Sequence, residues 1–366
     1  MAGGNGRKIT RLVAGGASSG ATLQDTLDAF AVPGTLWRSE GPGDVRCIAC
    51  GHRCLIREGR RGICKVRFNH GGVLMAPSGY VVALQADPIE KKPFFHLLPG
   101  SDALTFGMLG CDFHCGYCQN WLTSQALRDP DAGTPPTPIS AEAVVDLARR
   151  RGAASIVSSY NEPMITAEWA VEIFRLARPL GLRTGMVSNG SATPEGLDYL
   201  RPWTDAIKVD LKAIDERPYR ALGGTLRQVL EAIRMAHERG FWVEVVTLVV
   251  PGFNDSDEEL TDIAKFLVSV SPDIPWHVTA FHRDYRMTDP DDTPPSTLLR
   301  ARDIGLETGL HYVYAGNRPG EVGDTENTFC PSCGIALVER WGFRVLSNKI
   351  KEGKCFKCGT PIAGRW

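Results

Sequence analysis

Between residues 103 and 316 the sequence alternates short apolar runs with amphipathic helical patterns. The apolar runs are rich in β-branched residues and lie at 103–109, 154–160, 183–188, 206–212, 242–250, 276–282 and 311–315. The helical patterns are clearest at 140–151, 165–180, 226–239, 256–270 and 295–308. Strand–helix repetition with short loops builds a parallel sheet covered by helices. The units are too few for a closed eightfold barrel, so the pattern predicts an α/β fold built on a partial (β/α)6 TIM-type barrel at residues 86–320.

The 366-residue chain contains eleven cysteines, which fall into three separate groups. An odd number of cysteines in close clusters argues against a disulfide framework and, in a reducing compartment, for metal binding. Two groups hold four cysteines, and each can close a metal site. The third group holds three, Cys111, Cys115 and Cys118, and leaves one ligand position open.

The group of three lies in a loop directly after the first predicted strand, with the spacing C-x3-C-x2-C. Structural zinc normally takes four ligands. A four-iron cluster differs, because three thiolates can hold three irons while the fourth iron stays open to a substrate. We interpret the loop as such a cluster site. A zinc site completed by His114, or a loop with incidental cysteines, are the alternatives.

The first group of four lies in an N-terminal module predicted at residues 36–85. An N-terminal extension at 1–35 precedes it, in which residues 22–30 have a helical pattern. The spacing is C-x2-C-x3-C-x9-C, formed by Cys47, Cys50, Cys54 and Cys64. Structural zinc is the first interpretation and an auxiliary iron–sulfur cluster the second, because sequence alone separates these metals poorly. His52 is an alternative ligand or a solvent-facing residue. Nearby basic side chains face either solvent or an acidic partner; they are Arg57, Arg60, Arg61, Lys65 and Arg67.

The last group belongs to a C-terminal module predicted at residues 321–366. Cys330 and Cys333 form one C-x2-C knuckle, Cys355 and Cys358 form another, and β-like sequence lies between them. This spacing is typical of a zinc ribbon, with an iron–sulfur site as the main alternative. A module this short needs its metal in order to fold.

Polar residues end five of the remaining predicted strands. Each segment alone is an ordinary turn or ion pair. Because the carboxyl ends of parallel strands meet at one edge, we expect these residues to surround one mouth. They are Glu162 in Tyr160-Asn161-Glu162-Pro163, Ser188 with Asn189, Asp210 with Lys212, the segment 250–255, and His282.

The cysteine loop resembles that of the radical S-adenosylmethionine (SAM) superfamily. The run Gly-Cys-Asp-Phe-His-Cys-Gly-Tyr-Cys-Gln-Asn-Trp, followed by Tyr-Asn-Glu-Pro, Val-Ser-Asn-Gly, Asp-Leu-Lys and Val-Pro-Gly-Phe-Asn-Asp, is similar to the branch that contains pyruvate formate-lyase activating enzyme. Within this branch, the segments 46–54, 90–96 and 314–317 and the Cys-Pro-Ser-Cys ending resemble the radical SAM enzyme of the AmmeMemoRadiSam system. Tyr160 and Asn161 replace two glycines that usually precede the superfamily's Glu, so only the role of Glu162 is carried over.

This resemblance implies an enzyme. Cys111, Cys115 and Cys118 would hold a [4Fe-4S] cluster whose open iron chelates SAM, and a reductant such as flavodoxin or ferredoxin would supply one electron. SAM would then be cleaved to a 5′-deoxyadenosyl radical that abstracts hydrogen from an unidentified substrate, a small molecule or a peptidyl group. The residues implied to contact SAM are Tyr117, Glu162, Ser188, Asn189, Asp210, Lys212 and His282.

Two other functions remain open from the sequence. The chain can be an activating enzyme that abstracts hydrogen from a backbone glycine of a glycyl-radical enzyme. It can also be a non-catalytic metal-binding or regulatory protein that uses its terminal cysteine modules. Release of 5′-deoxyadenosine from SAM separates both enzymes from the third possibility.

Composition limits the partners and the compartment. Hydrophobic residues make up 43% and charged residues 23% of the chain, as in ordinary globular proteins. The formal net charge of -1 favours neither nucleic acid nor an anionic membrane. The first residues lack the apolar core of a signal peptide, and no apolar run approaches the roughly 18 residues of a membrane helix. We therefore expect a cytoplasmic protein that binds no nucleic acid and no membrane.

Overall fold

The computed structural model describes residues 21–366, so most of the predicted N-terminal extension lies outside the described residues. The helix predicted at residues 22–30 is confirmed as α1 (Leu23–Asp28). Its first turn is a capping box: the Thr22 hydroxyl accepts a hydrogen bond from the Asp25 N–H, and the Asp25 carboxylate accepts one from the Thr22 N–H.

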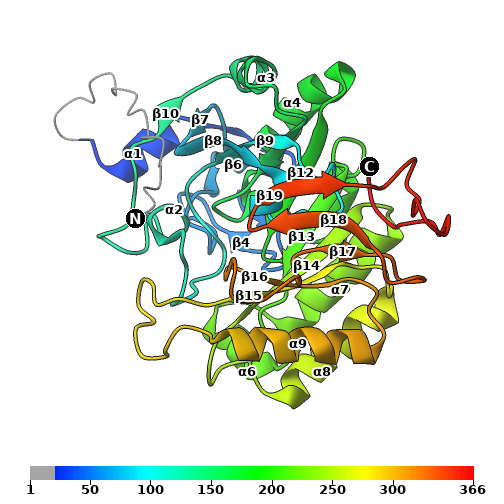
Figure 1. Cartoon of the computed structure of the whole chain (residues 1–366). Helices are drawn as coiled ribbons and strands as arrows, with labels where there is room; N and C mark the ends of the chain where they lie inside the picture. The colour runs from blue at the N-terminus through cyan, green and yellow to red at the C-terminus, as the bar shows by residue number, and fades with distance from the viewer. Residues whose placement is uncertain (1–20) are drawn as a thin grey trace, which may run out of the picture.

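One sheet of eight strands forms the centre of the molecule, in the order β16-β15-β14-β13-β12-β11-β9-β8 (Figure 1). Seven strands are parallel, and β8 lies antiparallel beside β9 at one edge. All seven predicted strands are present, which confirms an α/β fold and gives one parallel strand more than six units would supply. The strands are β8 (Ala83–Pro88), β9 (Asp102–Gly107), β11 (Ser155–Ser158), β12 (Arg183–Ser188), β13 (Ala206–Asp210), β14 (Trp242–Val249), β15 (Trp276–Ala280) and β16 (Val313–Gly316).

The register brings the loops after several strands to one edge of the sheet. Ser158, the last residue of β11, lies opposite Phe106 of β9. Ser188, the last residue of β12, lies opposite Val209 of β13. Since these neighbours are parallel and almost level, the segments that follow β9, β11, β12 and β13 leave the sheet side by side.

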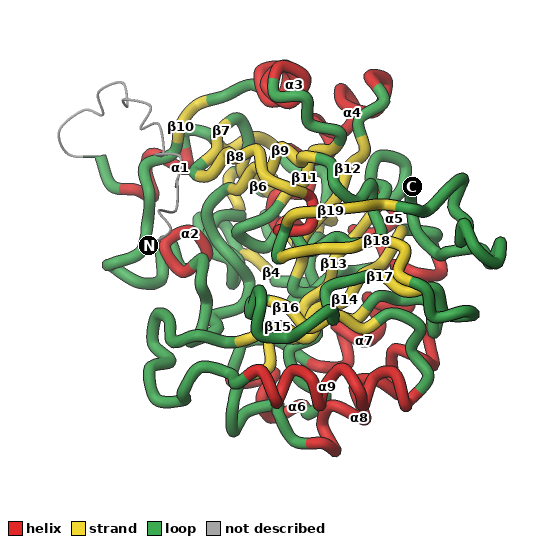
Figure 2. Tube along the Cα trace, in the orientation of Figure 1, coloured by secondary structure: helices red, strands yellow, loops and turns green. Residues whose placement is uncertain are grey.

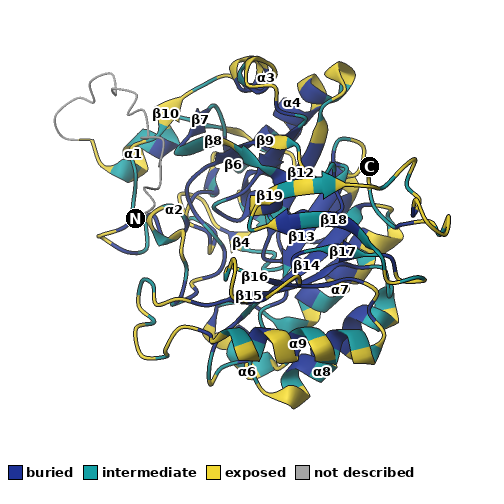
Figure 3. Cartoon of the chain, in the orientation of Figure 1, coloured by how far each residue is buried: buried dark blue, intermediate teal, exposed yellow. Residues whose placement is uncertain are grey.

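Helices flank the sheet on its outer side (Figure 2), and each turns a buried face towards the sheet and an exposed face to solvent (Figure 3). The Ser256 hydroxyl starts one helix by accepting a hydrogen bond from the Glu259 N–H at 3.2 Å. Gly305 lets another approach β15 closely, because a Cβ there would lie 2.9 Å from the Trp276 ring. The predicted helices are confirmed as α3 (Ala141–Arg150), α4 (Ala167–Ala177), α7 (Leu226–Glu238), α8 (Asp257–Val270) and α9 (Pro295–Thr308); α2 (Trp121–Ser124), α5 (Pro194–Leu200) and α6 (Glu216–Ala221) are additional.

A connector between β8 and β9 packs near the amino ends of the strands. It contains one short 3-10 helix, η1 (Ile89–Lys91), and then turns irregular, as its prolines predict. Buried Glu244 of β14 accepts hydrogen bonds from the Phe95 and His96 N–H groups, both at 2.9 Å. The His277 ring lies 2.8 Å from the same carboxylate. These contacts fix the connector against the sheet.

The N-terminal residues form small sheets that pack against the larger domain. Buried Arg67 makes two hydrogen bonds of 2.7 Å to Glu168 of α4, and Arg53 pairs with Glu195 of α5. The strands are β1 (Ala31–Pro33), β2 (Trp37–Ser39), β3 (Val45–Cys47), β4 (Leu55–Ile56), β5 (Phe68–His70) and β6 (Val73–Pro77), while β7 (Tyr80–Val81) pairs with β10 (Thr137–Pro138).

The C-terminal residues form an antiparallel sheet of β17 (Thr328–Phe329), β18 (Ala336–Trp341) and β19 (Arg344–Asn348), drawn in orange to red in Figure 1. Buried Arg340 of β18 donates a hydrogen bond to the Phe95 carbonyl at 2.8 Å and so ties this sheet to the connector. Among residues 21–366, no helix combines the length and the apolar composition needed to cross a membrane.

Candidate functional site

The loop that carries three cysteines follows β9 at the carboxyl edge of the sheet. Cys115 is buried, and Cys111 and Cys118 are half-buried. The Cys118 sulfur lies 3.1 Å from the Ser124 hydroxyl. Gly110 has φ +95°, and a Cβ there would meet Val66 at 2.8 Å, so glycine is needed both for the turn and for the close approach. The local fold therefore places all three thiols at the end of one strand.

Contacts from distant segments hold this loop in place. The Phe113 ring fills the space above Gly224, where a Cβ would lie 2.1 Å from the ring. Arg128 donates a hydrogen bond to the Phe113 carbonyl at 2.6 Å. The carbonyl of Gly116 accepts hydrogen bonds from the N–H groups of Arg286 and Met287 at 2.9 and 3.0 Å. Contacts between protein atoms thus hold the loop in place.

Glu162, Ser188 and Asn189 meet as the sequence predicts. One Glu162 carboxylate oxygen accepts a hydrogen bond from the Ser188 hydroxyl at 2.8 Å, and the other accepts one from the Asn189 N–H at 2.7 Å. The Asn189 side-chain amide reaches the Asp112 carboxylate at 2.8 Å and lies 3.8 Å from the Cys111 sulfur. Side chains from three strand ends therefore converge beside the first cysteine.

Burial, followed by the nearby Asp112 carboxylate, raises the pKa of Glu162 to about 8. Glu162 therefore holds its proton at neutral pH when no cation is beside it. An amino group that donates hydrogen bonds to Glu162 favours the charged carboxylate and lowers this pKa. Glu162 can thus accept hydrogen bonds from an amino group that binds at the edge of the sheet where the cysteine loop lies.

Asp210 and Lys212 form the second predicted pair. The Lys212 ammonium lies 3.2 Å from the Asp210 carboxylate, and Lys208 pairs with the other carboxylate oxygen. Burial opposes ionisation of Asp210, but the two lysines prevail and lower its pKa to about 2. The Lys212 ammonium also lies 5.9 Å from the centre of the buried Tyr117 ring. The pair thus continues the polar surface towards the cysteine loop.

His282 does not join this group. Its side chain is 53% exposed, and its ring nitrogen lies 4.0 Å from Asp284. The role predicted for His282 near SAM or substrate therefore stays a prediction. In the segment 250–255, Asn254 is buried and donates hydrogen bonds to the carbonyls of Lys212 and Leu248, both at 2.8 Å. This segment supports the neighbouring strand ends.

Three residues of this region had no predicted role. Lys208 is the third member of a Lys-x-Asp-x-Lys series, and the two-residue period of a strand is a sufficient signal to place it with Asp210. Asp112 lies inside the cysteine motif, but only the fold shows that its carboxylate is buried. Asn254 acts by tying two loops together, and no local sequence signal indicates that contact.

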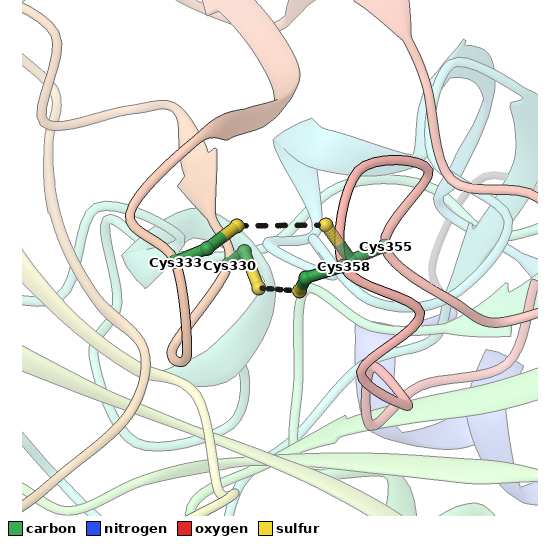
Figure 4. Close-up of side chains that lie close together, drawn as sticks. All are labelled: Cys330, Cys333, Cys355 and Cys358. Atoms are coloured by element: carbon green, nitrogen blue, oxygen red, sulfur yellow. Dashed lines mark hydrogen bonds between the residues drawn. The ribbon is translucent and has the colours of Figure 1, made fainter.

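The C-terminal cysteines gather at one point, as Figure 4 shows. The sulfurs of Cys330 and Cys358 lie 3.6 Å apart, those of Cys333 and Cys355 lie 3.8 Å apart, and all four are within 4.8 Å of one another. Thiolates at 2.3 Å from one tetrahedral ion are about 3.8 Å apart. This group can therefore bind a single metal ion.

The central site holds the donors that the cofactor implied by its sequence requires. Three thiols on one loop can supply three ligands to a [4Fe-4S] cluster, with no fourth cysteine of that loop to close it. Glu162 and Asn189 beside Cys111 offer hydrogen-bond partners to an amino acid bound there, and Lys212 offers a positive charge near Cys115. The donor set fits such a cluster with SAM beside it.

The loop that carries Cys111, Cys115 and Cys118 lies within the part of the chain that matches a known protein family. Residues 106–267 match the model of the Radical SAM superfamily. The chain is 38% identical over 322 residues to an uncharacterized protein of Methanocaldococcus jannaschii, covering 87% of this chain and 95% of that protein. It is 26% identical over 219 residues to a putative glycyl-radical enzyme activating enzyme of the same organism, covering 57% and 78%. It is 29% identical over 189 residues to the pyruvate formate-lyase-activating enzyme of Listeria monocytogenes, covering 46% and 70%.

Proposed function

Because the chain belongs to the radical SAM superfamily, as an activating-enzyme-like member, we propose that it cleaves SAM reductively at the Cys111–Cys118 loop and uses the resulting 5′-deoxyadenosyl radical to abstract hydrogen from a substrate. One observation carries this proposal: Glu162, Ser188 and Asn189 converge beside Cys111. When bound, a [4Fe-4S] cluster with SAM supplies the one-electron chemistry.

The chain's own residues position the SAM molecule in this proposal. Glu162 accepts hydrogen bonds from the amino group, and Ser188 with Asn189 contacts the carboxylate and ribose. Lys212 neutralises the carboxylate, and Asp210 contacts ribose hydroxyl groups. Tyr117 lies against the adenine, and His282 is assigned a place near ribose or substrate.

Finer assignments belong to the same proposal. We assign the chain to the radical SAM enzyme of the AmmeMemoRadiSam system on the flanking segments 46–54, 90–96 and 314–317. The parallel sheet is assigned the partial-barrel form, with its carboxyl edge as the mouth. We divide the chain into an N-terminal extension at 1–35, an N-terminal cysteine module at 36–85, a central domain at 86–320 and a C-terminal module at 321–366. The compartment is the cytoplasm, and the partners are a flavodoxin or ferredoxin and an unidentified substrate.

Zinc is the metal that we propose for the C-terminal group. The sulfur separations of 3.6 and 3.8 Å support it, because they agree with the edge of about 3.8 Å expected around one zinc ion. Cys358 is exposed and Cys330 is buried, as expected for a knuckle at the surface of a small sheet. Zinc here has a structural role.

A second candidate is activation of a glycyl-radical enzyme. The similarity to a putative glycyl-radical enzyme activating enzyme and to pyruvate formate-lyase-activating enzyme supports it. In this case the hydrogen comes from a backbone glycine of a partner protein. Deuterium placed on that glycine would appear in 5′-deoxyadenosine, whereas a small-molecule substrate would transfer its own label.

Anaerobic incubation of the reconstituted protein with SAM and dithionite tests the proposal. We expect release of 5′-deoxyadenosine and methionine. The variant Cys115→Ala should lose about four irons per chain and SAM cleavage, while it keeps its fold by circular dichroism. Loss of iron without loss of cleavage would refute the assignment. Absence of 5′-deoxyadenosine from fully reconstituted protein would instead favour a non-catalytic metal-binding protein.

A further inference from the structure

The N-terminal cysteine group lies directly against the loop of the proposed SAM site. The Cys64 carbonyl lies 3.1 Å from where a Cβ of Gly110 would be. One Arg128 guanidinium donates hydrogen bonds to the Ile63 carbonyl at 2.5 Å and to the Phe113 carbonyl at 2.6 Å. The two cysteine segments are therefore held together by a shared side chain.

A line of buried polar groups joins the two sites. Asp112 is fully buried, and one of its carboxylate oxygens has no hydrogen-bond donor but lies 3.6 Å from the His52 ring nitrogen. The other oxygen accepts from Asn189, whose amide is 3.8 Å from the Cys111 sulfur. The line thus runs from His52, which lies between Cys50 and Cys54 in the sequence, to Cys111.

The sulfur spacing differs between the two groups of four. The C-terminal thiols are packed as one ion requires, with all four sulfurs within 4.8 Å. In residues 21–366, neither the N-terminal thiols nor the trio after β9 contain three sulfurs gathered that closely. In a [4Fe-4S] cluster each thiolate binds a different iron, so the thiolates lie farther apart than the ligands of one zinc ion do. Among the described residues, the N-terminal thiols, like the proposed cluster trio, are therefore not gathered as tightly as the C-terminal four.

The opposite side of the N-terminal group faces solvent. Cys54 is half-buried, and its sulfur accepts a hydrogen bond from the Ile63 N–H at 3.4 Å. Around it, Leu55 is 47% exposed and Ile63 is 41% exposed. The charged side chains at this rim are Arg57, Glu58, Arg60 and Lys65, all exposed, and Glu58 is engaged by the N–H groups of Gly71 and Gly72. The face is thus apolar at its centre and basic at its rim.

We propose that Cys47, Cys50, Cys54 and Cys64 bind a second [4Fe-4S] cluster, and that this cluster relays electrons from an acidic ferredoxin docked at Leu55 and Ile63 to the cluster site at Cys111. The proposal deepens the proposed function and rests on it. Ferredoxins of the plant type are low-potential carriers. An acidic carrier complements the basic rim, which accelerates encounter.

The electron count of this relay balances. Reduced ferredoxin gives up one electron and is oxidised. The N-terminal cluster accepts that electron and passes it on through the Asp112 region, so it returns to its starting state. The electron ends on the SAM sulfur as its bond to the 5′ carbon breaks, which leaves methionine and one 5′-deoxyadenosyl radical per electron.

Metal analysis of the full chain is the first test. Anaerobically purified protein should contain about eight irons and about one zinc per chain, and Cys54→Ser should lose about half of the iron together with one electron paramagnetic resonance signal. About four irons with two zincs would overturn the second cluster. This readout does not depend on enzyme activity, and failure of dithionite-driven SAM cleavage by the intact protein would instead refute the proposed function.

Surface variants test the docking face without touching a ligand. In Arg57→Glu with Arg60→Glu, the ratio of ferredoxin-driven to dithionite-driven 5′-deoxyadenosine formation should fall about tenfold or more. The matched control is Lys354→Glu with Lys357→Glu, which also reverses two exposed charges beside four cysteines. An equal ratio in both variants would overturn the docking face. Dependence on the two arginines with reduced flavodoxin but not with ferredoxin would overturn the choice of carrier.

Discussion

At the scale of single residues, Glu162 gives the most direct test of the proposed SAM site. Its carboxylate accepts hydrogen bonds from Ser188 and Asn189 and is buried beside Asp112. Glu162→Gln replaces the carboxyl group, at nearly constant volume, with an amide that cannot become negatively charged beside the SAM amino group. We expect the Kd for SAM to rise about tenfold or more, because a hydrogen bond to a charged group contributes about 1.5–3 kcal/mol. Isothermal titration of reconstituted protein measures this change.

The matched control for this variant is Glu142→Gln. Glu142 lies in the first turn of α3 and is exposed, so its neutralisation should leave SAM affinity unchanged. If both variants bind SAM as tightly as the wild type, Glu162 has no contact with SAM, and its buried hydrogen bonds serve only to position Asn189.

Individual residues also show what the sequence can and cannot predict. The trio of cysteines follows from their short spacing within one loop. The pairing of Asp210 with Lys212 follows from the two-residue period of a strand, which places both side chains on one face. The contact between His52 and Asp112 joins residues that are far apart in the sequence. No local pattern encodes such a contact, since it depends on how the N-terminal sheets pack on the loop after β9.

At the scale of elements, the loop after β15 acts as a clamp on the cysteine loop. The Tyr285 hydroxyl and the Arg286 guanidinium reach the Asp129 carboxylate at 2.6 and 2.8 Å, and the Tyr285 ring stacks on Trp121. In Asp129→Asn we expect the amides of Arg286 and Met287, which donate to Gly116, to lose about tenfold or more in hydrogen-exchange protection. Mass spectrometry of exchanged peptides measures this.

Asp131→Asn is the control for the clamp. Asp131 is exposed two residues away, and only its backbone N–H contacts Asp129. Its exchange pattern at residues 283–288 should match the wild type. Unchanged exchange in the Asp129 variant would show that backbone hydrogen bonds alone hold the loop after β15.

The connector between β8 and β9 predicts a pH dependence of stability. Burial lowers the pKa of His96 to about 4 from its ordinary value of 6.5. Below pH 6.5 the unfolded chain binds a proton that the folded chain refuses, so the free energy of unfolding falls by up to about 1.4 kcal/mol per pH unit down to pH 4. In His96→Gln we expect a smaller drop of the urea midpoint between about pH 7 and about pH 5.

His311→Gln is the comparison for that variant. The His311 side chain is 43% exposed and pairs with Asp273 at the surface. Its replacement should leave the drop of the urea midpoint on acidification as in the wild type. An equally steep drop in His96→Gln would assign the acid sensitivity elsewhere; the buried His277, whose pKa burial also lowers, is the next group to replace.

Elements were predicted well where the pattern is long and poorly where it is short. The seven parallel strands follow from apolar, β-branched runs, which are buried on both faces. Helix α5 contains Pro194 and Gly196, and α6 contains Pro218, so their sequences read as loops. The edge strand β8 has only a weak alternation of buried and exposed residues and ends at Pro88. Its own sequence therefore does not predict a strand, and pairing with β9 stabilises it.

At the scale of the whole molecule, the C-terminal sheet closes the amino end of the central sheet. Arg340 of β18 donates to the Phe95 carbonyl, and the Arg365 N–H donates to the His96 carbonyl at 2.7 Å. Both contacts fall on the connector whose N–H groups bind Glu244. Order in the C-terminal sheet is therefore coupled to the packing of the connector, far from the loop that carries Cys111, Cys115 and Cys118.

Loss of the C-terminal metal should for this reason destabilise more than the small sheet. In Cys333→Ser we expect proteolytic cleavage within residues 329–366 and a fall in Tm, because a small sheet held by four thiolates folds only with its metal. Cys115→Ala is the control, since it removes a ligand of the central site and leaves Arg340 and Arg365 in place. Limited proteolysis with mass spectrometry locates the cuts. If the Cys333 variant loses its zinc but resists cleavage and keeps its Tm, the contacts of Arg340 and Arg365 with the connector are sufficient to order this region without metal.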